Sequence, residues 1–222
     1  MTTARRATRG AGKATRQALL RAATEVFTEH GESASVAQIC QRANAFPNQV
    51  TYYFGSKEQL FVEVACAAVL RAGRQAEDAA ASAITIRDYT RTLVGTLLGP
   101  AARDVEMFTT AMLVIGRRPD LRPLITAALT RLHERGEQAL LATLVRNGWH
   151  LRADAAVETR AFWSAIFGLI AQRAGAGEEF GYSANDAVAI VFTAMQIPDA
   201  VLDRAFTESA PATPTPSGKD QQ

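Results

Sequence analysis

The sequence predicts an all-α protein in which an N-terminal three-helix helix-turn-helix domain precedes a larger helical domain. Apolar residues recur at helical spacing along most of the chain, and no segment alternates convincingly as a β-strand would. Near the N-terminus, two predicted helices of about two turns each meet at a sharp turn, which is the arrangement of a helix-turn-helix. With 222 residues, of which 48% are apolar, the chain can bury a sizeable core.

The N-terminal segment divides into an arm and a first helix. Residues 1–14 are basic and rich in Gly, Ala and Thr, without hydrophobic periodicity, so we expect a flexible arm. Its positive charges could follow DNA phosphates or only keep the protein soluble. From Thr15 to Phe27 apolar residues recur at helical spacing until Gly31, which predicts a helix of about four turns.

The next two helices are short and closely spaced. Ser35 is a good N-cap, and Gln38 stands three residues later, where a capping box needs it. Asn44 tolerates the left-handed backbone conformation of a sharp turn, and Pro47 is favoured at the first position of a new helix. The sequence therefore predicts helices at 35–43 and 47–54 with a tight turn between them.

The helix at 47–54 has one apolar side, formed by Val50 and Phe54 at i and i+4. Asn and Gln side chains can pair with base edges in the major groove, Thr can contact a thymine methyl, and Tyr hydroxyls can reach phosphates. Lys57, at the start of the following helix, adds a charge beside free backbone N–H groups. This clustering favours a DNA-facing surface over a core, made up of Asn48, Gln49, Thr51, Tyr52, Tyr53 and Lys57.

The larger domain begins with a helix from Lys57 toward Ala80. The same periodicity predicts helices at 84–98, 102–116, 120–147, 155–174 and 184–206, separated by Gly- and Pro-containing breaks. The Pro/Ser/Thr-rich end, residues 208–222, is expected to be disordered. We therefore assign residues 15–60 to the helix-turn-helix domain and residues 61–207 to the larger one.

Positive charge is concentrated at the N-terminal end. Residues 1–57 hold eight Lys and Arg against three acids, a net charge of +5, whereas the other 165 residues hold 16 bases and 19 acids, a net charge of −3. Such asymmetry is typical of a module that meets a polyanion, although basic termini are also common solvated tails. No apolar run is long enough for a membrane helix or signal peptide, so a cytoplasmic location is expected.

The segments "TRQALLRAATEVFTEHG", "SVAQICQRANA" and "VTYYFGSKEQLF" resemble the DNA-binding domain of the TetR family of bacterial transcriptional regulators. The resemblance implies a larger domain that binds a small molecule and dimerises, and release from operator DNA when the ligand binds. Carried over by position, Ser35 and Tyr52 would contact phosphates and Lys57 would anchor the DNA backbone. Bases would lie at or near Pro47, Asn48, Gln49, Thr51 and Tyr53.

The sequence departs from the family pattern at three places. Asn44 stands where members usually have Gly, and Phe46 stands where a small N-cap such as Ser usually opens the recognition helix. We expect Asn48 to compensate for the missing cap. Thr51 and Tyr53 replace a Tyr and a His of the commonest motif, which should alter the operator sequence.

The larger domain offers candidates for an effector pocket and a dimer interface. Apolar, aromatic and histidine side chains could line a pocket or simply pack in the core: Met107, Phe108, Met112, His133, Trp163 and Phe167. Small residues that share a helical face, together with the last helix, could form a four-helix dimer interface: Ala161, Ala165, Gly168, Val188, Val191, Phe192 and Met195. A two-fold dimer would place its recognition helices about 34–36 Å apart and bind a palindromic operator.

Other classes of function find little support. The sequence lacks a phosphate-binding Gly-rich loop, a nucleophile elbow and a metal-ligand cluster, so we expect neither an enzyme nor a bound metal or cofactor. Cys40 and Cys66 are simplest as small buried residues, with a redox role as the alternative. The leading hypothesis is a homodimeric repressor released from DNA by a small, mostly apolar molecule. The alternative is an architectural DNA-binding protein without a ligand.

Overall fold

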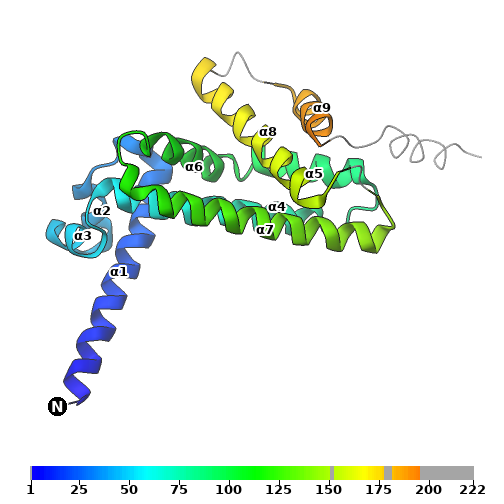
Figure 1. The fold of residues 1–222 in the computed structure, drawn as a ribbon. Helices are drawn as coiled ribbons and strands as arrows, with labels where there is room; N and C mark the ends of the chain where they lie inside the picture. The colour runs from blue at the N-terminus through cyan, green and yellow to red at the C-terminus, as the bar shows by residue number, and fades with distance from the viewer. Residues whose placement is uncertain (1, 151–152, 178–181, 196–222) are drawn as a thin grey trace, which may run out of the picture.

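The computed structural model describes residues 2–150, 153–177 and 182–195, and every regular element in these ranges is helical (Figure 1). The elements in chain order are α1 (Thr2–His30), η1 (Gly31–Ser33), α2 (Val36–Ala43), α3 (Pro47–Phe54), α4 (Lys57–Ala80), α5 (Ile86–Leu98), α6 (Ala102–Val114), η2 (Pro119–Leu121), α7 (Arg122–Asn147), α8 (Ala155–Ala176) and α9 (Ala184–Ala194). The all-α prediction is confirmed. The predicted ends of most helices shift by a few residues, and the turn before α7 is a short 3-10 helix. The expected continuation of α9 to residue 206 and the tail at 208–222 lie outside the described residues.

The N-terminal segment differs from the prediction. Residues 2–14, expected as a flexible arm, continue α1 as helix. Ala and Arg, which are among the best helix formers, make up much of this segment, and they offset Gly10 and Gly12. In Figure 1 this part of α1 passes α3 and projects beyond the rest of the molecule.

Helix α4 joins the two domains and lies at the centre of the larger one, where it packs against α5, α6 and α7. Small residues on its buried face, such as Ala68 and Ala72, allow these helices to approach closely. At its start, Phe61 packs edge-to-face on Phe27 of α1 with ring centroids 5.1 Å apart. The predicted domain boundary at residue 60 therefore falls within one continuous helix and one continuous core.

Helix α9 packs against α5 and α8 of its own chain. Val188, Val191 and Met195, predicted for the dimer interface, are buried there with 6%, 0% and 3% of their surface exposed. That prediction is wrong for these three residues, because their side chains already fill the core of one chain. Phe192 is only half-buried.

Ala161, Ala165 and Gly168 of α8 are also half-buried, and a Cβ added at Gly168 would meet no atom within 4 Å. This outer face of α8 keeps room for another helix.

Both cysteines are free thiols, with Cys40 buried and Cys66 half-buried. Within the described ranges, no helix has the length and apolar character that a membrane crossing requires.

Candidate nucleic-acid interface

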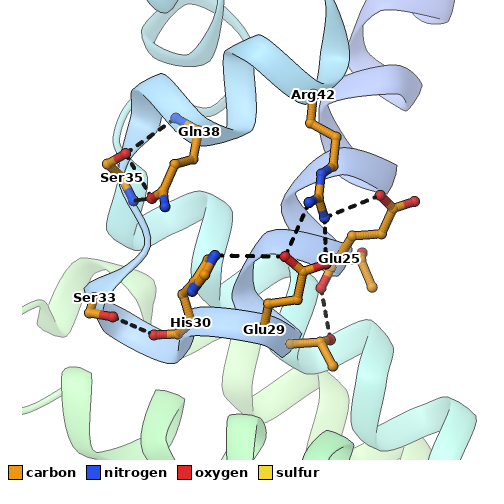
Figure 2. Close-up of polar contacts among 9 residues, drawn as sticks. Glu25, Glu29, His30, Ser33, Ser35, Gln38 and Arg42 are labelled. Carbon is orange, nitrogen blue, oxygen red and sulfur yellow. Dashed lines mark hydrogen bonds and ion pairs between the residues drawn. The ribbon is translucent and has the colours of Figure 1, made fainter.

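Helix α2 begins with the predicted capping box (Figure 2). The Gln38 backbone N–H donates to Ser35 Oγ over 3.2 Å, and Gln38 Oε1 accepts from the Ser35 backbone N–H over 2.8 Å. The Ser35 hydroxyl also donates to Gln38 Oε1. The side chain predicted as a phosphate contact thus holds the start of α2, while remaining exposed at the surface.

The turn between α2 and α3 depends on Asn44. Its backbone is left-handed, with φ 49° and ψ 52°, and it is the only non-glycine residue with positive φ in the described part of the chain. The Ala45 backbone N–H then donates to the Cys40 carbonyl over 2.9 Å, which closes the end of α2. The predicted tight turn is confirmed.

Helix α3 begins without a side-chain cap. Phe46 occupies the N-cap position with extended backbone, and its side chain has no atom that can accept a hydrogen bond. Instead, Gln49 Oε1 accepts from the Phe46 backbone N–H over 2.9 Å. Gln49 thus supplies one half of a capping box, by bonding the Phe46 N–H and not the first N–H groups of α3, and its amide nitrogen is left to act as a donor.

The two sides of α3 have different environments. Val50 and Phe54 are 2% and 1% exposed and anchor the helix in the domain core. Tyr52 is 80% exposed, and the side chains of Pro47, Asn48 and Thr51 are exposed as well. Phe46, at 74% exposed, extends this surface, which was not predicted from the sequence.

Helix α1 contacts the inner side of α3 through Arg16 and Gly12. The Arg16 guanidinium lies 4.7 Å from the centroid of the Phe54 ring and forms an ion pair of 2.6 Å with Glu63 of α4. A Cβ added at Gly12 would lie 3.4 Å from the hydroxyl of Tyr53, so the Tyr53 side chain reaches α1. No local sequence pattern indicates the Arg16 contact, because it joins residues distant in the chain.

An exposed ion-pair cluster fixes α2 on α1 (Figure 2). Arg42 donates to both carboxylate oxygens of Glu29 over 2.7 and 3.1 Å, and it lies 3.5 Å from Glu25. The hydrogen bond from Arg42 lowers the pKa of the Glu29 carboxyl. The charge of Arg42 is thus neutralised within the domain. Positive charge that can meet DNA must therefore come from other Lys and Arg residues.

Lys57 has an internal role in the structure. Its Nζ donates to the carbonyls of Glu32 and Ala34 over 2.8 Å each, which ties the start of α4 to the connection between α1 and α2. An ammonium group has three donors, so one remains for a phosphate.

Arg118, in the turn between α6 and η2, reaches the start of α4 from the larger domain. Its guanidinium forms a two-pronged ion pair with Asp120 over 2.9 and 2.8 Å, and this pairing raises its pKa. The same group donates to Ser56 Oγ over 3.1 Å and to Glu58 over 3.4 Å. Because Ser56 is the N-cap of α4, Arg118 links the larger domain to the joint between α3 and α4.

The predicted pocket residues do not form one site. Trp163, Phe167 and Phe108 form an aromatic cluster, with ring centroids 5.5 and 5.7 Å apart. Met107 instead lines a groove beside Phe27, between the two domains. Met107 and Phe108 have different surroundings, because adjacent residues of a helix lie about 100° apart around its axis.

The remaining two predicted pocket residues lie apart from the cavities found in the larger domain. His133 and Met112 are half-buried and line neither the cavity around Gly73 and Trp163 nor the one between α5, α8 and α9. Burial, together with the charge of Arg160, lowers the pKa of His133.

Two cavities lie in the larger domain. A cavity of about 30 Å³ is lined by Gly73, Glu77, Tyr89 and Trp163 among others, and a larger one of about 310 Å³ lies between α5, α8 and α9. Burial raises the pKa of Glu77, and it raises that of Tyr89 to about 12. These two polar groups were not predicted from the sequence, because they stand singly among apolar residues.

Comparisons with known proteins agree with this architecture. A family model described as "Bacterial regulatory proteins, tetR family" matches residues 19–64, and one described as "Bacterial transcriptional repressor C-terminal" matches residues 86–192. No curated protein matches the sequence.

Solved structures give the same result. A structure described as a candidate transcriptional regulator from Rhodococcus sp. RHA1 is 59% identical, with a TM-score of 0.76, over 85% of this chain and 98% of that chain. A TetR-family regulator from Mesorhizobium loti is 17% identical, with a TM-score of 0.63, over 87% of this chain and 97% of that one. FadR from Bacillus subtilis, solved with stearoyl-CoA, is 14% identical, with a TM-score of 0.51, over 82% of this chain and 96% of that one. The last two show the fold alone.

The capped α2, the left-handed turn at Asn44 and the outward polar side of α3 are the parts of a DNA-binding helix-turn-helix. Together with the two family matches and the similarity to the Rhodococcus protein, they identify the chain as a DNA-binding transcriptional regulator that belongs to the TetR family.

Proposed function

We propose that this regulator is a homodimeric repressor that binds a palindromic operator and is released by a small, mostly apolar molecule. The observation that carries the proposal is the two-sided character of α3. Val50 and Phe54 fix its inner side, while Asn48, Thr51 and Tyr52 project from a rigidly supported surface. Side chains held in this way can enter a major groove without losing much conformational freedom.

Each polar or aromatic residue of this surface has a role in this proposal. Asn48, Thr51 and the free amide nitrogen of Gln49 contact base edges, with Pro47 and Tyr53 beside them. Tyr52 and Ser35 contact phosphates, and Lys57 adds its remaining donor at the start of α4. Gln49 is then restrained, because its oxygen already accepts from the Phe46 N–H.

The effector would occupy the cavity around Gly73 and Trp163 in the larger domain. This cavity has an apolar and aromatic lining with Glu77 and Tyr89 as polar groups, and it adjoins the Trp163 cluster. Its volume of about 30 Å³ holds little more than water, so an effector must open it. An effector weakens operator affinity only if it binds the conformation with the opened cavity more tightly than the conformation that fits DNA. Opening the core to admit the effector makes its affinity for these two conformations differ.

The dimer would form through the outer face of α8. Ala161 and Gly168 are half-buried there, and Val157 on the same helix is 52% exposed. Ala161→Arg should shift the protein from dimer to monomer in sedimentation velocity. Thr126→Arg, at an exposed position on α7, is the matched control and should remain dimeric.

Selection of sequences from random DNA by the purified protein tests the repressor proposal. The expected result is one inverted repeat, bound with steep salt dependence and released by a compound that also raises the thermal unfolding midpoint. Binding without sequence preference would favour the architectural alternative and contradict the proposal.

Two point variants test the assignment of α3 within that experiment. Gln49→Ala should relax the preference at one operator position, whereas Lys57→Ala should weaken binding to all sequences and reduce the salt slope by about one charge per protomer. Unchanged operator binding by both variants would show that a different surface meets the DNA.

A further inference from the structure

The indole of Trp163 on α8 lies in a slot between glycines of two neighbouring helices. A Cβ added at Gly73 of α4 would lie 3.5 Å from Cζ2 of the ring, and one added at Gly136 of α7 would lie 3.5 Å from the ring nitrogen Nε1. Phe162 and Phe167 also pack on the indole, with ring centroids 5.6 and 5.5 Å away. The two glycines thus allow a close approach and fix the indole with its nitrogen toward α7.

This oriented N–H group has no acceptor among the residues that the structure describes. Trp163 is 3% exposed, and its Nε1 makes no hydrogen bond in the described ranges. A buried indole N–H usually has a partner, because leaving it unpaired costs free energy. The group is therefore ready to donate to a bound molecule.

Thr159, one turn earlier on α8, carries a second unused donor. It is 4% exposed, and its Oγ1 has no hydrogen-bond partner in the described part of the chain. Other helical threonines, such as Thr109 and Thr143, donate to the carbonyl four residues earlier. Thr159 and Trp163 stand at i and i+4, so they share one side of α8, and both line the cavity of about 30 Å³.

The rest of the lining argues against an anionic ligand. Most of these side chains are apolar, among them Leu93, Leu97 and Leu140. Glu77 is the one charged side chain among the described residues that line the cavity. A ligand carboxylate would therefore meet a like charge and no cation.

A cationic ligand does not match the donors either. Burial raises the pKa of Glu77, and the positive charges of Arg135 and Arg74 partly offset this effect. The Glu77 carboxyl thus already has two cations of its own chain nearby. An ammonium group has no lone pair, so it would leave the Trp163 N–H unpaired, whereas a carbonyl oxygen has two lone pairs and can accept from both donors.

We propose that the effector is an apolar molecule with an uncharged carbonyl oxygen, which accepts hydrogen bonds from Trp163 Nε1–H and the Thr159 hydroxyl. The inference rests on the proposed function, in which the effector occupies this cavity. It narrows the effector to ketones, esters, lactones and amides. Because about 30 Å³ admits little more than one polar group, the apolar remainder of the molecule separates the surrounding side chains.

The test measures the binding of acetophenone, ethylbenzene, benzoate and 1-phenylethylamine to the full chain by isothermal titration calorimetry. Acetophenone should bind at least about fivefold more tightly than ethylbenzene, which has a similar shape but no oxygen, because each hydrogen bond contributes about two- to twelvefold. Benzoate and 1-phenylethylamine, which are charged at neutral pH, should bind more weakly than acetophenone.

Variants at Thr159 assign the preference to its hydroxyl. Thr159→Val keeps the shape of the side chain and should weaken acetophenone binding about two- to twelvefold while leaving ethylbenzene binding unchanged. It should not lower the thermal unfolding midpoint, because the lost hydroxyl has no partner in the described ranges. Thr159→Ser keeps the hydroxyl and should keep the preference for acetophenone.

Thr90→Val is the matched control. Thr90 on α5 is 0% exposed and its Oγ1 also lacks a partner in the described ranges, but it does not line this cavity. Its replacement should leave the binding of all probes unchanged.

NMR of the indole groups gives an independent readout. The chain has two tryptophans, so ¹⁵N-labelled protein shows two indole signals, and Trp149→Phe assigns them. Acetophenone should move the Trp163 N–H proton further downfield than ethylbenzene does, because ethylbenzene reports the ring-current effect alone.

The outcomes separate this inference from the proposed function. It is overturned if acetophenone binds no more tightly than ethylbenzene, if a charged probe binds best, if none of the probes binds, or if Thr90→Val causes the same loss as Thr159→Val. None of these results affects operator selection by the wild-type protein, whose failure would instead contradict the proposed function.

Discussion

The two sides of α3 should fail in separable ways when each is mutated. Phe54 is 1% exposed and lies in the core that holds α1, α2 and α3 together. Phe54→Ala removes a buried aromatic side chain, a change that costs about 3–5 kcal/mol of unfolding free energy. Asn48 is exposed, and Asn48→Ala should change that free energy by no more than about 0.5 kcal/mol.

These costs translate into distinct thermal shifts. In a chain of this size, 1 kcal/mol moves the unfolding midpoint by about 2–4 °C, so Phe54→Ala should lower it by about 6–20 °C. Asn48→Ala should stay within about 2 °C of the wild type. Loss of a base contact by Asn48→Ala should instead cost about 1–3 kcal/mol of discrimination at one base pair.

The assay combines thermal unfolding by circular dichroism, without DNA, with operator binding by anisotropy well below the midpoint. Phe54→Ala should lose both stability and operator affinity, whereas Asn48→Ala should lose affinity alone. A wild-type midpoint for Phe54→Ala, or an equally large destabilisation by Asn48→Ala, would refute the assignment of inner and outer sides.

Two further predictions concern the larger domain. A Cβ at Gly136 would lie 2.8 Å from Thr159 Cγ2, so Gly136→Ala should lower the unfolding free energy, measured in urea, by up to about 2 kcal/mol. Adding Thr159→Ser, which removes Cγ2, should restore the lost stability. Gly95→Ala, whose Cβ would meet nothing within 4 Å, should raise the unfolding free energy by up to about 1 kcal/mol. Arg118→Gln should leave effector binding in calorimetry unchanged but reduce the loss of operator affinity that the effector causes; an unreduced loss would exclude Arg118 from the coupling.

The features of the helix-turn-helix that the sequence predicted are those set by local rules. The capping box at Ser35 and the turn at Asn44 each depend on residues within a few positions. The same offset rule could have identified Gln49, because the side chain at the third helical position accepts from the N-cap backbone whatever the N-cap residue is. The prediction that Asn48 compensates is wrong, because in the described part of the chain its side chain makes no hydrogen bond and α3 begins without a side-chain cap.

The prediction failed where the rotation of a helix about its axis decides the outcome. Helix α9 has apolar residues almost all around, so periodicity cannot tell whether Val188 and Val191 face their own chain or a partner. The contacts of α5 and α8 settle the question, and both residues are buried within the chain. The contacts of Arg118 are not predictable from the sequence for a related reason, since its partners Ser56 and Glu58 lie about sixty residues away in the chain.

The contacts at residues 56–58 indicate how a change in the larger domain would reach the DNA. Arg118 holds Ser56 and Glu58, while Lys57, between them, holds the carbonyls of Glu32 and Ala34. A displacement of the turn that carries Arg118 therefore acts on the start of α4 and, through Lys57, on the connection between α1 and α2.

The helix-turn-helix itself should resist deformation, because its helices share one buried core that includes Phe27, Ile39 and Phe54. We therefore expect the domain to move as a rigid unit, with its surface unchanged, so that the separation of the two recognition helices in the dimer changes. Operator affinity then depends on how well that separation matches one turn of DNA, about 34–36 Å, rather than on any rearrangement of the contacts within one half-site.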